Sequence, residues 1–221
     1  RINYEFAGKY LLSAVARYDG SSVFPPGEKF GFFPGVSVGW RLSEEDFLSG
    51  NSLISNLKLR AGYGKVGNPL NAGRFASLFT INFGSIYPFG PDGTINTGAA
   101  PTRLSNPELR WETNNQTNIG VDVGLLDNRI EASLDFYNRD SPNLIAPVPP
   151  SLVSGTFESV NTNAASAYNR GFDFSLSSRN VQGSGQGLTW TTLFNISAFT
   201  TNLESLGLGI PYNGPNFLSN S

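Results

Sequence analysis

The sequence predicts an all-β fold, a segment of an antiparallel β-barrel that crosses a membrane. Three observations support this prediction. Several stretches alternate apolar and polar residues with a period of two, which is typical of strands with one apolar and one polar face. The connections between these stretches are alternately short and long, as in outer-membrane barrels. Charged residues make up only 14% of the chain, well below the roughly 25% usual in soluble domains.

The clearest alternating stretch begins at Phe32 and reads F-F-P-G-V-S-V-G-W-R. Val36, Val38 and Trp40 fall on one side, whereas small residues and Arg41 fall on the other. A polar side built from small residues and one charge suits the wet lumen of a wide barrel, with the apolar side against lipid. We therefore expect a membrane-spanning strand here.

This strand is expected to end at Ser43, where the sequence continues Ser-Glu-Glu-Asp. The pattern is typical of a helix N-cap followed by acidic residues in the first turn. We therefore expect Glu44, Glu45 and Asp46 to stabilise a short helical turn, and prefer this reading to a catalytic cluster of carboxylates.

Three elements precede this strand. Residues 1–6 are expected to be the end of a strand, residues 7–9 a tight turn, and residues 10–19 an alternating strand whose polar face is interrupted by Leu11 and Val15. The loop at 20–31 contains Pro-Pro-Gly, which a central strand cannot hold. A further strand is expected at residues 57–65, and the segment 67–109 is expected to be one long irregular loop of the kind that outer-membrane barrels carry on their outer side.

The clearest hairpin joins residues 111–125 to residues 129–139. Asp127-Asn128 suits a two-residue turn that needs positive φ. This turn would pair Leu125 with Ile130 and Asp122 with Ser133, so that each face stays consistent. A long loop with four prolines is expected at 141–166, then strands at 168–179 and 188–201 joined by a Gly/Ser turn, which gives about eight strands in all.

The alternation assigns side chains on all these strands to two faces. The side chains expected to face lipid are Val36, Val38, Trp40, Val121, Leu134, Phe174 and Trp190. Those expected to face the lumen are Arg17, Arg41, Arg60, Asp122, Asp135 and Asp173. We expect the lumen charges to form a wall of mixed sign, in preference to a catalytic pair of carboxylates.

Composition excludes several classes of function. The chain has no histidine and no cysteine, so it offers no Ser-His or Cys-His pair and no zinc-thiolate site. Neither a calcium loop nor a phosphate-binding glycine motif is present. The net charge of −2 gives no reason to expect a nucleic-acid partner. We therefore expect neither an enzyme nor a cofactor.

The loop at 67–109 is rich in aromatic residues: Phe75, Phe79, Phe83, Tyr87 and Phe89. Such side chains could stack on sugar rings or grip apolar side chains of a peptide, or contact a partner protein. The alternative, which we favour, is that they pack on one another or on a partner to hold a long loop in shape.

Four motifs together resemble the SusC/RagA-like TonB-dependent transporters of the outer membrane. They are G-x-F-P-x-x-S-x-G-W with S-E-E-x-F-L at 31–48, R-Y-D-G-S-S at 17–22, L-K-L-R at 57–60 with Gly64 and Gly67-Asn68, and N-P-E-L-R-W-E at 106–112 leading into Q-T-N-I-G at 116–120. The motifs cover nearly the whole chain, in the order and spacing of the family.

The resemblance implies an interior part of the C-terminal barrel domain, spanning residues 1–221, in a barrel of about 22 strands. The plug domain, the TonB-contacting segment and the final strands would lie outside it. Such transporters import oligosaccharides or oligopeptides, are energised through TonB and are covered by a SusD-like surface lipoprotein. Two alternatives stay open: a complete eight-stranded structural or adhesive outer-membrane barrel, and a soluble β-sandwich that binds carbohydrate.

Overall fold

The structure, a computed structural model, describes residues 1–48, 50–89, 91, 93–151, 153, 158–183 and 187–206. This part of the chain contains ten strands and two short 3-10 helices. The strands are β1 (Ile2–Phe6), β2 (Tyr10–Gly20), β3 (Phe30–Arg41), β4 (Ile54–Asn68), β5 (Thr80–Phe89), β6 (Thr94–Arg103), β7 (Glu112–Leu125), β8 (Ile130–Val148), β9 (Val160–Gln182) and β10 (Thr189–Ser205). The 3-10 helices are η1 (Leu42–Glu44) and η2 (Leu70–Ala72). Within the described ranges, no helix is long and apolar enough to cross a membrane.

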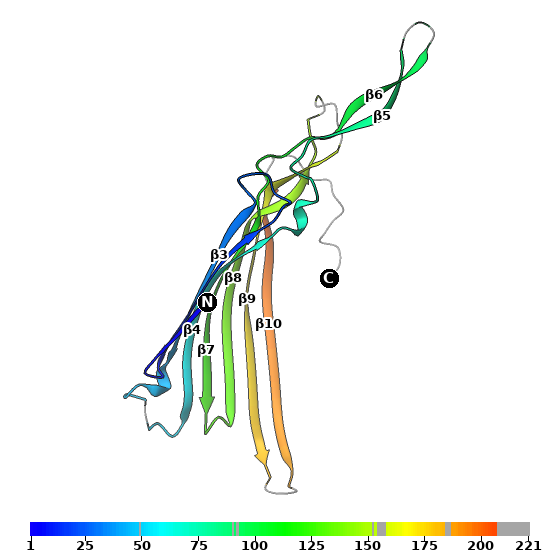
Figure 1. The fold of residues 1–221 in the computed structure, drawn as a ribbon. Helices are drawn as coiled ribbons and strands as arrows, with labels where there is room; N and C mark the ends of the chain where they lie inside the picture. The colour runs from blue at the N-terminus through cyan, green and yellow to red at the C-terminus, as the bar shows by residue number, and fades with distance from the viewer. Residues whose placement is uncertain are drawn as a thin grey trace.

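Eight strands form one antiparallel sheet, in the order β1-β2-β3-β4-β7-β8-β9-β10. The sheet is tall and curved, and β1 and β10 are its two edges (Figure 1). Strands β5 and β6 pair only with each other and project beyond one end of the large sheet as a hairpin (Figure 1). The predicted all-β fold, with eight strands in the wall, is confirmed.

The register keeps apolar side chains on one face across the whole sheet. One row of directly paired residues runs through Phe6, Tyr10, Trp40, Leu59, Val121, Leu134, Phe174 and Ile196. The next row runs through Arg41, Lys58, Asp122, Ser133, Ser175 and Asn195 and is entirely polar. Because side chains alternate along a strand, a slip of one residue would exchange the faces.

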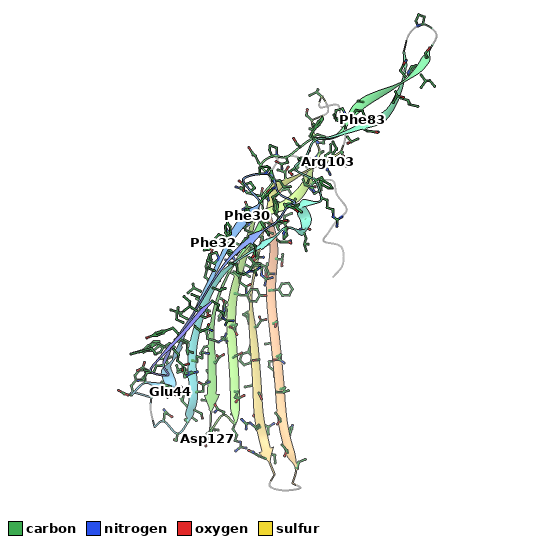
Figure 2. The ribbon with its side chains drawn as sticks, viewed as in Figure 1. Phe30, Phe32, Glu44, Phe83, Arg103 and Asp127 are labelled. Atoms are coloured by element: carbon green, nitrogen blue, oxygen red, sulfur yellow. The ribbon has the colours of Figure 1, made fainter. Side chains whose placement is uncertain are left out.

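Short connections gather at one end of this sheet. Figure 2 shows Glu44 and Asp127 at that end, far from Phe30 and Phe32. The predicted turn at Asp127 and Asn128 is confirmed, since their φ angles are 55° and 57°, and so are the predicted pairs on either side of it. The turn at residues 7–8 has the same handedness, with φ angles of 53° and 68°.

Two of the predicted loops are wrong in extent. The loop expected at 141–166 is shorter, because β8 continues to Val148 and β9 already begins at Val160. Pro142 does not end β8 because it lies where the register between β8 and β9 shifts, so no ladder hydrogen bond is needed from it. The loop expected at 67–109 is not irregular, because it contains η2 and the β5–β6 hairpin.

The predicted helix N-cap at Ser43 is also wrong. Ser43 lies inside η1, and the residue before this helix makes no side-chain capping hydrogen bond. The helical turn itself is present, but it is a single 3-10 turn, which is too short to build an appreciable dipole. Glu45, which follows this turn, binds side chains of β2 and β3 and of the turn before β2, as described below.

A small core closes the end of the sheet with the long connections. Its buried members are Phe24, Phe33, Ala72, Ala76, Leu109 and Trp111. Phe33 projects from the polar face, and its ring occupies the space that a Cβ on Gly31 or Gly67 would need. The connections 21–29 and 69–111 therefore fold over the polar face of β3 and β4 at this end.

Candidate functional site

The polar face of the large sheet is the candidate functional site. The register places all six residues expected to face a lumen on this face, and all seven expected to face lipid on the other. The apolar face is bare, since Val38 and Trp190 remain 50% and 58% exposed. That the bare apolar face meets lipid and the polar face a lumen stays a prediction.

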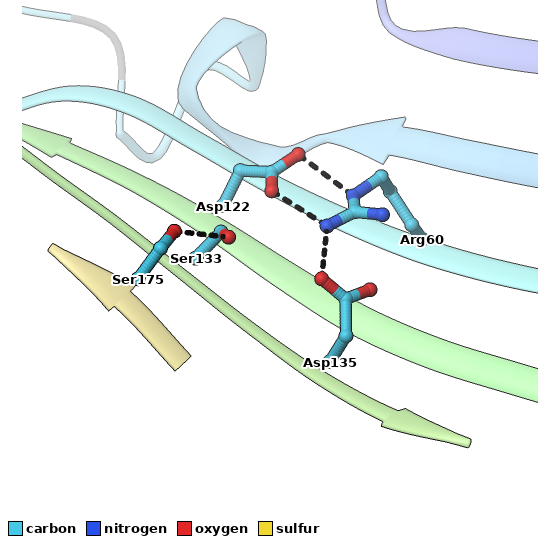
Figure 3. A network of polar contacts seen from close by, with 5 residues as sticks. All are labelled: Arg60, Asp122, Ser133, Asp135 and Ser175. Atoms are coloured by element: carbon cyan, nitrogen blue, oxygen red, sulfur yellow. Dashed lines mark hydrogen bonds and ion pairs between the residues drawn. The ribbon is translucent and has the colours of Figure 1, made fainter. Parts of the chain in front are cut away.

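Arg60 is the centre of the polar face (Figure 3). Its Nε and Nη2 donate to the two carboxylate oxygens of Asp122, each at 2.8 Å, and Nη2 also donates to Asp135 Oδ2 at 3.0 Å. The network therefore links β4, β7 and β8. A bidentate pair of this kind combines charge with fixed geometry, which makes it stronger than a single ion pair.

Glycines make this network possible. Gly120 lies between Arg60 and Asp135 in the same row of paired residues. A Cβ at Gly120 would lie 2.3 Å from Asp135 Oδ1 and 3.0 Å from Arg60 Nη2. The bare backbone at this position therefore lets the guanidinium cross one strand and reach the next.

Beyond the ion network, Ser133 and Ser175 continue the polar surface onto β9 with a hydroxyl–hydroxyl hydrogen bond of 2.9 Å (Figure 3). Asp173 is exposed and directly paired with Asp135. Two like charges in direct cross-strand register are unfavourable, and the bond from Arg60 offsets this at Asp135.

Two hollows lie on the polar face. One, of about 590 Å³, lies over β1 to β4 and reaches Asn118 on β7, and the other, of about 710 Å³, lies over β7 to β10 and reaches Arg41 on β3 and Asn56 on β4. Lys58 lines both. The polar face is therefore the concave side of the curved sheet, as the lumen side of a barrel must be.

Arg17 and Arg41 lie on the same face, at the margins of the Arg60 network. Arg41 Nη1 donates to Glu5 Oε1 at 2.9 Å and to the carbonyl of Gly8 at 2.8 Å. Arg17 pairs with Asp19 two residues later on β2. Arg41 is thus held by acceptors on β1 and in the β1–β2 turn, and Arg17 by an acceptor on its own strand.

Glu45 binds the polar ends of two aromatic side chains on the apolar face. Its Oε1 accepts from Tyr10 Oη at 2.8 Å and Trp40 Nε1 at 2.9 Å, and Oε2 accepts from Lys9 Nζ at 3.1 Å. The hydrogen bonds from Trp40, Tyr10 and Lys9 lower the pKa of Glu45 below its usual range. The hydrogen bond to Glu45 likewise raises the pKa of Lys9.

The motif N-P-E-L-R-W-E fixes the long connection to the sheet, a role that the sequence alone did not reveal. Glu112 is 4% exposed. Its carboxylate accepts from Asn68 Nδ2 at 2.8 Å, from Asn71 Nδ2 at 2.8 and 3.1 Å, and from the backbone N–H of Ile145 at 2.8 Å. The sequence feature that could have indicated this role is Glu112 directly after Trp111, together with Asn68 and Asn71.

Asparagines on β9 hold the same segment from the other side. Asn163 Nδ2 donates to the carbonyl of Arg110 at 2.8 Å, and its Oδ1 accepts from the Arg110 N–H at 2.9 Å. Asn106 Nδ2 donates to the carbonyl of Asn161 at 2.8 Å. The returning chain is therefore tied to β9 before it enters β7.

Three aromatic residues of the long connection, Phe75, Phe79 and Phe83, lie outside the small core. Phe75, Phe79 and Phe83 are 65%, 50% and 71% exposed, and Phe83 lies on the projecting hairpin (Figure 2). Among the described side chains these three form no ring contact with one another. The side chains of Tyr87 and Phe89 lie outside the described part. A role in contacting a solute or a lid protein stays a prediction.

The described carboxylates do not gather into a metal site. In the described ranges, no group of three or more acidic side chains is close enough to hold a metal ion. Asp122 and Asp135 are both engaged by Arg60, as expected of a wall of mixed charge.

The chain is similar to known proteins over nearly its whole length. The family model described as TonB dependent receptor-like, beta-barrel, matches residues 1–220. TonB-dependent receptor P3 of Formosa agariphila is 39% identical over 89% of this chain and 19% of its own length. TonB-dependent receptor SusC of Bacteroides thetaiotaomicron is 30% identical over 89% of this chain and 19% of its own length.

The fold matches as well. The solved structure of the RagAB peptide importer in the open-open state superposes with a TM-score of 0.80 and 26% identity, covering 97% of this chain and 22% of that chain. This chain thus spans about a fifth of the length of the relatives that it matches. The predicted resemblance is confirmed, and the chain belongs to the TonB-dependent receptor family as part of its β-barrel.

Proposed function

We propose that this chain forms part of the wall of an outer-membrane importer that takes up oligosaccharides or oligopeptides. The observation that carries the proposal is the separation of an apolar and a polar face over eight strands, with a few exceptions such as Leu11 and Lys65. One face is mainly apolar and bare, and the other is mainly polar, concave and crossed by the Arg60 network. A wall of this kind separates lipid from an aqueous path.

The two alternative functions fit the sheet less well. A closed eight-stranded barrel requires β1 to pair with β10, but these strands are the two edges of the described sheet. A soluble sandwich requires a second sheet packed on the apolar face, whereas Val38 and Trp190 on this face remain exposed. An incomplete arc of a wider barrel accounts for both observations.

The partners follow from the same proposal. Uptake would be energised through TonB, and a SusD-like surface lipoprotein would cover the end of the barrel from which the β5–β6 hairpin projects. Support comes from SusC and from RagAB, whose structure is that of a peptide importer. The short connections, including the turns at 7–8 and 127–128, would then lie in the periplasm.

Cysteine labelling tests the proposed wall. Neighbouring positions on one strand, Ser133→Cys and Leu134→Cys, would be introduced into the full-length receptor and exposed to a charged maleimide in intact outer membranes. We expect Ser133→Cys to react and Leu134→Cys to be protected, because they lie on opposite faces. Equal reactivity of the two positions, or the reverse order, would contradict the assignment of the faces.

Uptake tests the transport itself. Cells that lack the receptor would be supplied with fluorescent oligosaccharides and oligopeptides, with and without the gene for the full-length protein. Accumulation that requires both this gene and the proton gradient would support the proposal. Accumulation that persists without the gene or without the proton gradient would refute import through TonB.

A further inference from the structure

The cations on the polar face of β2, β3 and β4 differ in their partners. The ion pairs are Arg17–Asp19, Arg41–Glu5, Arg60–Asp122 and Arg60–Asp135. Lys58 lies on the same face, half-buried, and within the described residues it makes no hydrogen bond and no ion pair. Among the described residues, it is therefore the cation on the polar face of these three strands that no acidic side chain of the sheet neutralises.

The absence of a partner has a geometric cause. Lys58 is directly paired with Asp122 on β7, the position from which an acid would ordinarily bind it. Both oxygens of Asp122 are instead taken by Arg60, at 2.8 Å each. Arg60 can lean toward β7 because Gly120 opens the way, and so the acid nearest to Lys58 is already engaged.

Lys58 leans in the opposite direction. Its Cε lies 3.3 Å from the place where a Cβ on Gly39 would be, so its stem rests on the bare backbone of β3. There it lines the hollow over β1 to β4, together with Glu5, Arg60 and the neutral polar side chains of Asn3, Ser13, Ser37 and Asn118. Because Glu5 is paired with Arg41, and Arg60 with Asp122 and Asp135, Lys58 is the charged side chain of this hollow that no described partner neutralises.

We propose that Lys58 binds a carboxylate of the imported solute, in a subsite whose amides and hydroxyls contact the rest of that solute. This inference rests on the proposed function, since it requires the polar face to line the path of import. An ammonium group is a compact charge with three donors and suits a carboxylate. The amides and hydroxyls can both donate and accept, as the hydroxyls of a uronic-acid sugar or the amides of a peptide require.

Binding of matched probes tests the subsite in the full-length receptor. The probes are trigalacturonic acid against its uncharged methyl ester, and acetylated trialanine with a free C-terminal carboxylate against its amide. The first pair reports an acidic sugar as the source of the carboxylate, and the second reports a peptide. Lys58→Gln should weaken binding of the acid form about tenfold and leave the neutral form unchanged, because charge-assisted hydrogen bonds are roughly twice as strong as neutral ones.

Two further variants control for the fold. Lys58→Arg keeps the charge and should retain most of the affinity. Lys65→Gln removes a charge from the opposite face of the same strand and should change nothing. If Lys58→Gln binds the acid and neutral forms as the wild type does, or if neither acid form binds the wild type, the subsite is refuted.

Chemical labelling distinguishes this subsite from a site filled by the receptor itself. In the unliganded receptor Lys58 should react with a water-soluble amine reagent, and trigalacturonic acid or the free peptide should slow the reaction whereas its neutral counterpart should not. A Lys58 that is unreactive before any probe is added would already be bound by another part of the protein, which overturns the proposal. Failure of cells to import any solute, with Lys58 reactive and protected by acid, would instead overturn the proposed function alone.

Discussion

The two ends of the large sheet are held by different kinds of contact. At the end with short connections, the turns at 7–8 and 127–128 are closed by hydrogen bonds between residues three positions apart, Lys9 to Phe6 and Arg129 to Leu126. At the other end, Glu112 binds side chains 41 and 44 residues away and a backbone N–H 33 residues away. One end is built from local geometry, and the other from contacts distant in sequence.

The difference shows how a barrel wall can carry long connections that are nevertheless ordered. A two-residue turn needs only residues that tolerate positive φ. A connection of about forty residues has no such local rule and needs its own core, here Phe24, Phe33, Leu109 and Trp111 with their neighbours. Single substitutions should therefore be far more damaging at the long-connection end than at the turns.

The largest effect is expected from Glu112→Ala. It would leave the amides of Asn68 and Asn71 and the N–H of Ile145 without their acceptor in a buried place. We expect the free energy of unfolding to fall by about 3–5 kcal/mol, because each unsatisfied buried group costs about 1–3 kcal/mol. Limited proteolysis of the full-length receptor in detergent should show new cleavage between residues 69 and 111.

Glu108→Gln is the matched control, because Glu108 lies on the same segment and is exposed. It should leave both the cleavage pattern and the thermal unfolding midpoint unchanged. If Glu112→Ala behaved like this control, the long connection would not depend on the buried carboxylate, and the contrast between the two ends would be wrong.

The middle of the sheet should respond less strongly. In Gly120→Ala the new methyl group would overlap Asp135 and crowd Arg60, which separates the arginine from at least one acid. We expect this overpacking to lower the free energy of unfolding by about 1–3 kcal/mol. The change should appear as a lower midpoint of thermal unfolding. Gly64→Ala on β4 has nothing within 4 Å of the new Cβ and should be neutral or slightly stabilising. Equal destabilisation by both variants would remove the special role of Gly120.

The sequence was sufficient for the parts of the fold that obey local rules. Alternation identified the two faces of β2, β3, β4, β7, β8, β9 and β10, and Asp127-Asn128 identified its turn, because side-chain period and positive φ are properties of a few neighbouring residues. The pairing of Asp122 with Ser133 followed from that turn alone. The motifs gave the family for the same reason, since each is a short local pattern.

The remainder depends on distant contacts. The path of residues 67–109 could not be predicted, because the β5–β6 hairpin has few charges and no clean alternation. The role of Glu112 was hidden because its donors come from β4, from the connection after it and from β8. Glu45 misled us in a similar way. Beside Ser43 it suggested a capped helix, yet its partners Lys9 and Tyr10 lie more than 30 residues earlier.

Glu45 is an exception to the contrast between the two ends. It makes contacts with residues distant in sequence at the end where local turns dominate. Its pKa is lowered by the bonds from Trp40, Tyr10 and Lys9, so these bonds are fully formed above the ordinary glutamate pKa of about 4.3. As the pH falls through the lower pKa of the folded state, the carboxylate is protonated and this stabilisation is lost. The emission of Trp40 should therefore shift only when the pH falls below the ordinary glutamate value.

A comparison with Glu45→Gln isolates this titration. The amide cannot titrate, so the emission of this variant should be flat over the same pH range, and Trp111 and Trp190 provide a common background in both proteins. An identical acid transition in the two proteins would assign the change to some other carboxylate.

The smallest effect is expected at the first turn. Ala7 has a φ of 53°, a conformation that costs a residue with a Cβ about 1–2 kcal/mol, while glycine loses roughly 0.5–1 kcal/mol more conformational freedom on folding. Ala7→Gly should therefore raise the free energy of unfolding by no more than about 1 kcal/mol. Ala16→Gly, in the extended interior of β2, should lower it by a similar amount. Opposite signs for one chemical change would show that the backbone conformation at each position decides the effect, and equal signs would contradict it.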